Sequence, residues 1–130
     1  MICILALALF SVANIQAADR TWTGGGGDDF WSTSANWDAA PGAGDTLVFD
    51  GASRLSNTND LGATAFAGIT FASGAGAFTL AGNAITLGGN VSNLSSSAQT
   101  INLPMALSDD RTIYGSAAAL TINGTLIDSS

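Results

Sequence analysis

From about residue 46 onward, the sequence consists of short alternating runs separated by turns. Apolar and polar side chains alternate over about four positions before Gly, Asn, Asp or Ser intervenes. The runs are DTLVFDG, AGITFASG, GAFTLAG, NAITLGGN, QTINLPM, RTIYG and LTINGTLID. Each run has the pattern of a short β-strand followed by a turn. The chain is therefore predicted to be an all-β protein.

Several of these runs resemble one another. AFTLAGN, AITLGGN and ALTINGT share the order apolar-Thr-apolar-x-Gly, which indicates degenerate internal repetition. Repeated short strands with corners rich in Gly, Ala, Thr and Asn favour rungs stacked into a β-solenoid. A β-sandwich is the alternative arrangement.

The alternation also predicts which side chains form the core. Residues two apart along a strand share a face, so one set is expected to point inward and the other outward. The predicted inward set is Val48, Ile69, Phe71, Phe78, Leu80, Ile85, Leu87, Ile101, Leu103, Ile113, Leu120 and Ile122. The predicted outward set is Thr70, Thr79, Thr86, Asn102 and Thr121.

The charged residues are few and mostly acidic. The chain has 10 acidic residues, all Asp, against 3 Arg and no Lys, which gives a net charge of -7. This charge would repel phosphate backbones, so nucleic acid is not an expected partner. The lack of Lys and Glu also removes good helix-surface residues.

Catalytic chemistry finds little support in this composition. There is no His, which excludes His-based triads and His-containing zinc sites. The Asp28/Asp29 and Asp109/Asp110 pairs are candidates for glycoside hydrolysis, with Arg111 as a nearby cation. Because no feature of the sequence would separate their pKa values, no enzymatic activity and no cofactor are expected.

The N-terminus has the features of an export signal. Residues 2–12 are almost wholly apolar, and the small residues Ala13, Ala17 and Ala18 follow before the first charges. Residues 1–18 are predicted to be a signal peptide, because their apolar run is too short to span a membrane comfortably. Its removal would take away Cys3, the only cysteine. A buried strand or helix is the alternative for this segment.

Residues 19–45 form a distinct aromatic and polar segment that contains Trp22, Trp31 and Trp37. We expect these tryptophans to cap the first rung of the repeats, which would occupy residues 46–130, because large apolar rings can cover an otherwise open edge. The alternative is an exposed platform on which carbohydrate rings stack, as in an adhesin.

The four glycines at 24–27 precede Asp28 and Asp29 and match one copy of a calcium-binding nonapeptide repeat. Such sites take ligands from successive repeats, and here the pattern occurs once, so Asp28 and Asp29 are weak calcium candidates and no metal site is expected. A flexible glycine turn is the simpler interpretation.

Together these segments resemble the autotransporter-associated β-strand repeat family of bacterial exported proteins. The matching residues are Trp22 to Gly24, Trp31, Ser32, Asn36, Trp37, Pro41 to Asp45 and Phe49, followed by strands built around Ile-Thr-Phe and Leu-Thr-Leu. The resemblance implies a right-handed β-helix that forms a structural passenger or stalk, exported to the outside or the cell surface of a Gram-negative-type bacterium.

In that case the segment shown would be the start of a longer solenoid, and its mature part would not insert into a membrane. An adhesin that binds extracellular polysaccharide or cell-surface components, and a β-helix polysaccharide-processing enzyme, are the two rival hypotheses.

Overall fold

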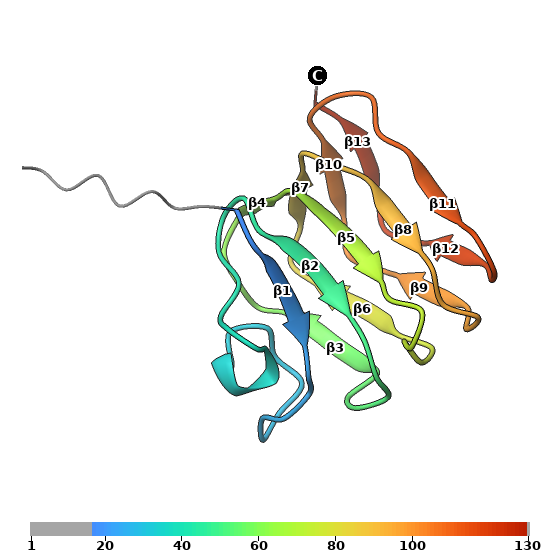
Figure 1. Cartoon of the computed structure of the whole chain (residues 1–130). Helices are drawn as coiled ribbons and strands as arrows, with labels where there is room; N and C mark the ends of the chain where they lie inside the picture. Colours follow the sequence, from blue (N-terminus) through green and yellow to red (C-terminus); the bar gives the residue numbers. More distant parts are fainter. Residues whose placement is uncertain (1–16, 130) are drawn as a thin grey trace, which may run out of the picture.

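The computed structural model of the chain describes residues 17–129. Their strands form three parallel sheets that wrap around one core as a β-solenoid of about four turns (Figure 1). Most of the predicted signal peptide lies outside the described residues, and only Ala17 and Ala18 of it belong to them. The prediction of an all-β solenoid is therefore confirmed.

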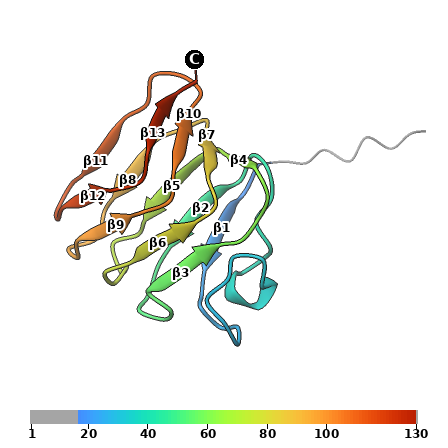
Figure 2. The same cartoon turned by 180° about the vertical axis from the view of Figure 1, so that it is seen from behind.

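Each full turn contributes one strand to each sheet. The first sheet has the order β1 (Asp19–Trp22), β2 (Thr46–Phe49), β5 (Gly68–Phe71), β8 (Val91–Asn93) and β11 (Ile113–Gly115). The second has β3 (Ser56–Asn59), β6 (Thr79–Gly82), β9 (Gln99–Ile101) and β12 (Leu120–Ile122). The third has β4 (Thr64–Phe66), β7 (Ile85–Leu87), β10 (Met105–Leu107) and β13 (Leu126–Asp128). Figure 2 shows from behind that the strands of the second and third sheets follow one another in the same direction along the solenoid, away from β1.

The parallel register gives the spacing of equivalent residues in the first sheet. In the first sheet Leu47 pairs with Ile69, Ile69 with Val91, and Val91 with Ile113. Each step along this row therefore adds 22 residues. Equivalent side chains stack directly above one another, because parallel strands in register place the same face inward at every turn.

The core consists of these inward rows. Most of the predicted inward residues are buried, and Ile113, Leu120 and Ile122 of the last turn are partly buried. The prediction that Val48 faces inward is wrong. Val48 lies on the outer face, and its neighbours Leu47 and Phe49 are buried instead. Leu-Val-Phe is apolar throughout and fits either register, and the pairing of Phe49 with Phe71, whose rings stack 5.6 Å apart, selects this one.

Buried amides close the corners between sheets. Asn93 is fully buried, and its side-chain NH₂ donates to the backbone oxygens of Ser97, Ala118 and Ala119. The Gln99 side chain donates to Gly76 O and accepts from Phe78 N. A corner turns the backbone away from the sheet ladders, so these side chains satisfy groups that would otherwise be buried without partners.

Candidate functional site

The tryptophans lie together at the β1 end of the solenoid. Trp22 ends β1, Trp31 follows the glycine loop, and Trp37 follows the short 3-10 helix η1 (Ser34–Asn36). The Trp37 ring meets those of Trp22 and Trp31 edge to face, at centroid distances of 5.1 and 5.9 Å. Phe49 packs against all three rings. We call Trp22, Trp31 and Trp37 the tryptophan lid.

The indole rings of the tryptophan lid are buried, and their N–H groups form hydrogen bonds within the protein. Trp22, Trp31 and Trp37 are 1%, 0% and 4% exposed. The Trp31 indole N–H donates to Asn57 Oδ1 at 2.8 Å, and the Trp37 indole N–H donates to Trp31 O at 3.0 Å. No indole face is therefore open to a stacked sugar, which contradicts the alternative of an exposed carbohydrate platform on these rings. The rings pack against Phe49 because burial removes their large apolar surface from water, which stabilises the fold more than an exposed position would.

The glycine run is a packed loop whose positions are not equivalent. Gly24 has φ +61°, and a Cβ there would lie 2.8 Å from Ser53 O. Gly26 donates its N–H to Asn36 Oδ1 at 2.8 Å, so a Cβ would strike that side chain. Gly27 has open space around it. The glycines thus serve close backbone packing beside the lid.

Asp28 and Asp29 have different partners. Asp28 accepts hydrogen bonds from the Thr33 hydroxyl, Phe30 N and the Asn36 side chain. These bonds, led by the one from Thr33, lower the pKa of Asp28 because they favour its charged form. Asp29 instead forms an ion pair with Arg54 at 2.9 Å. Among residues 17–129, no three His, Cys, Asp or Glu side chains come together as metal ligands.

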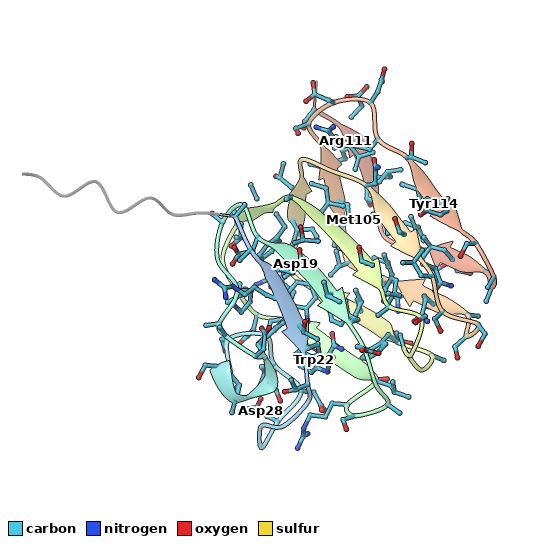
Figure 3. The ribbon with its side chains drawn as sticks, in the orientation of Figure 1. Asp19, Trp22, Asp28, Met105, Arg111 and Tyr114 are labelled. Atoms are coloured by element: carbon cyan, nitrogen blue, oxygen red, sulfur yellow. The ribbon has the colours of Figure 1, made fainter. Side chains whose placement is uncertain are left out.

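Asp109 and Asp110 lie at the other end of the molecule, near the last turn. Arg111 forms an ion pair with Asp109 at 2.9 Å, and both aspartates are exposed. Figure 3 shows Arg111 and Asp28 at opposite ends of the solenoid, so the two acidic pairs do not form one site. The described part of the chain has no pocket around either pair.

Among the described residues, Asp45 is the one aspartate that is buried, and the sequence does not single it out as a site residue. Its side chain is 5% exposed. Asp45 Oδ2 accepts hydrogen bonds from Arg20 Nε and Gly42 N, both at 2.9 Å, and Oδ1 accepts one from Ala18 N at 3.0 Å. Burial acts to raise the pKa of Asp45, but these bonds outweigh it and lower the pKa below its ordinary value.

Asp45 could have been found from the sequence by its setting. It follows the turn Pro41-Gly42-Ala43-Gly44, where a carboxylate can accept hydrogen bonds from turn N–H groups. The chain also has only 3 cations, so a carboxylate held by one of them has few competitors. What the sequence did not show is that Arg20 lies beside Asp45, since 25 residues separate them.

The outer face of the second sheet carries a row of hydroxyls. Ser56 pairs with Thr79, Thr79 with Thr100, and Thr100 with Thr121, so these outward side chains follow one another from turn to turn. Beside this row, Asn123 Nδ2 donates to Asn102 Oδ1 at 2.9 Å. Strand neighbours lie about 4.8 Å apart, which makes this a regularly spaced polar face. We call Ser56, Thr79, Thr100 and Thr121 the hydroxyl row.

Within the described residues, the structure contains no helix of the length and apolar character that a membrane crossing requires. No protein-family model, no curated protein and no solved structure matches the chain.

Proposed function

We propose that the chain is a structural stalk segment of an exported surface protein, as its resemblance to the autotransporter-associated repeats implies, and that it has no catalytic role. The support comes from the difference between the two ends of the solenoid. At the first end the tryptophan lid covers the core. At the other end β11, β12 and β13 are each paired on one side only, among the described residues.

The second end has the chemistry of a surface that can accept a further turn. Leu126 of β13 pairs with the buried Met105 and shares its inward face, yet it is 47% exposed. Ile113, Leu120 and Ile122 of the same turn are only partly buried. Unpaired backbone N–H and C=O groups on edge strands are a template for another strand. A stalk lengthens by this means, since each added turn buries its inward side chains on the one before.

The composition supports export in an unfolded state. Beyond the predicted signal segment there is no Cys, so no disulfide can form before the chain has crossed a membrane. Each turn pairs only with its neighbours, which allows folding to proceed turn by turn as the chain emerges.

Display on a cell surface tests this proposal. Residues 18–129 are placed between an export signal and an autotransporter translocator barrel, and surface exposure is measured with antibody and added protease. We expect efficient display and a protease-resistant segment. The variant Leu80→Asp, which puts a charge in the core, should remain protease-sensitive, and the outward variant Thr79→Asp should behave like the parent. Display that is equally resistant in the Leu80→Asp variant would contradict a stalk that depends on folding.

A second candidate function, binding of an extracellular polysaccharide, is favoured by the hydroxyl row. A polysaccharide array probed with the protein and with a Thr79→Ala/Thr100→Ala variant tests it. Binding that is lost in this variant, and kept in a Thr70→Ala/Thr86→Ala variant of the other two sheets, would establish the adhesin hypothesis in place of a purely structural stalk.

A further inference from the structure

Ala18 is the residue at which the described chain joins the fold. Its backbone N donates to Asp45 Oδ1 at 3.0 Å, and its backbone O accepts from Thr46 N at 2.9 Å. The second of these bonds continues the parallel pairing of β1 with β2 by one position. Ala18 therefore belongs to the folded body, although the sequence pattern assigned it to the signal peptide.

The carboxylate that faces Ala18 N is suited to a positive charge. Asp45 Oδ2 is occupied by Arg20 and Gly42, and Oδ1 is left to Ala18. Arg20 is the ion-pair partner of Asp45 through Oδ2, and Oδ1 faces only the neutral amide of Ala18 in the described residues. A positive charge at the Ala18 nitrogen would give Oδ1 a charged partner as well.

We propose that the export signal is removed by hydrolysis of the Ala17–Ala18 peptide bond, and that the new α-ammonium of Ala18 forms an ion pair with Asp45. This inference rests on the proposed export. Water adds across the C–N bond, leaving a carboxylate on Ala17 and an amine on Ala18 that takes up a proton. The peptidase that removes export signals in the producing cell supplies the catalyst.

Conversion of the Ala18 amide into an ammonium strengthens its bond to Asp45. An amide N–H is one neutral donor, and an ammonium is a charged group with three donors. The amide bond has one charged partner, the Asp45 carboxylate, and the ammonium adds the attraction of a second, opposite charge at the same distance. Processing at this bond would therefore fasten the first strand to the turn at Gly42 more firmly than the precursor does.

The two neighbouring cleavage positions lack this property. Cleavage after Ala18 would remove both of its contacts and leave Thr46 N without its acceptor. Cleavage after Ala13, which follows Ser11 and Val12 in a small-x-small pattern, would leave an ordinary peptide N–H at Ala18. Of these cleavage positions, only the one before Ala18 places a new positive charge beside Asp45.

The first test identifies the mature N-terminus. The full chain is expressed with its own N-terminal segment in a Gram-negative bacterium, and the exported protein is analysed by intact mass and N-terminal peptide mass. We expect Ala18 as the first residue. A start at Asp19 or Asn14 would overturn the proposed site and leave export standing, whereas an uncleaved chain retained in the cytoplasm would overturn both.

The second test measures the ion pair. Because the 130 residues contain no Lys, the α-amine is the only primary amine of this chain after processing, and its rate of reductive methylation can be followed by mass spectrometry. We expect Asp45→Asn to raise this rate roughly tenfold, through loss of a charge-assisted bond. Asp38→Asn, which alters the acceptor of Thr21 N on the same strand, should leave the rate unchanged.

A variant with one extra Gly before Ala18 keeps Asp45 intact and moves the amine away from it, and it should also react faster. If Asp45→Asn fails to fold, this variant tests the ion pair in its place. Equal rates in the parent and in the Gly-extended protein would overturn the ion pair.

Discussion

Gly24 and Gly27 belong to one run of four glycines but occupy different environments. Gly24 has a positive φ and lies against the Ser53 backbone, and Gly27 faces open space. Gly24→Ala should therefore destabilise the protein by about 1–3 kcal/mol, through left-handed strain and crowding. Gly27→Ala should change the free energy of unfolding by less than about 0.5 kcal/mol. Urea unfolding of the two variants measures the difference, and equal losses would contradict the packed loop.

Asp45 predicts how the stability of the fold depends on pH. Its pKa is lower in the folded protein than in the unfolded chain, so the charged form stabilises the fold above the unfolded value of about 3.9. That contribution is lost as the pH falls below about 4 and through the folded pKa. Thermal unfolding should show that the stability of the parent falls over this pH range and that the stability of the Asp45→Asn variant falls less steeply. An Asp45→Asn variant with the same acid profile as the parent would rule out this assignment.

At the scale of elements, the tryptophan lid predicts a contrast between two adjacent aromatic residues. Trp31 is fully buried, and Phe30 beside it is 45% exposed. Trp31→Ala should cost about 3–5 kcal/mol of unfolding free energy, as expected for removal of a buried aromatic side chain. Phe30→Ala should be nearly neutral. Denaturant unfolding compares them, and a small loss at Trp31 would mean that the lid does not close the core.

The strands show which part of the fold could be read from the sequence. Runs with apolar alternation, such as Gly68–Phe71 and Thr79–Gly82, are strands in the structure. The strand Ser56–Asn59 could not be found in this way, because its inward residues Asn57 and Asn59 are polar. Asn57 accepts the Trp31 indole N–H, and Asn59 binds the corner at Asn83. Asn57 and Asn59 face inward because each has a hydrogen-bond partner there that lies far away in the sequence.

The repeat was visible in the sequence, but its true length was not. AFTLAGN and AITLGGN look like successive copies, yet they contain β6 and β7, which belong to different sheets. The structural row that starts at Phe49 continues through Phe71, Asn93 and Gly115. Because a large ring, an amide and a glycine occupy equivalent positions, the 22-residue spacing of this row leaves little trace in residue identity.

The candidate site was predicted less completely than the fold. The tryptophans were correctly grouped at one end of the chain, but their exposure depends on how Phe49 and Asn57 pack against them. Asp45 depends on Arg20 and Ala18, which meet it only after β1 has paired with β2. These are long-range contacts, and alternation reports only local ones.

At the scale of the whole molecule, the solenoid is closed by the lid at one end and offers three edge strands at the other. Ser129 N donates to Leu107 O just as Ser108 N donates to Leu87 O, so the chain leaves the last turn as it left the one before. A copy of residues 110–129 added after the C-terminus should therefore continue the register and form a further turn.

Amide hydrogen exchange on this extended protein is the decisive measurement, because it reports whether the open edge accepts a rung. The amides of β11, β12 and β13 should exchange at least about tenfold more slowly than in the parent, since these strands become interior. A control extension with Asp in place of the copied Ile113, Leu120 and Ile122 should give no protection. Unchanged exchange in the first extension, with the added residues unprotected, would contradict a stalk that grows by stacking turns.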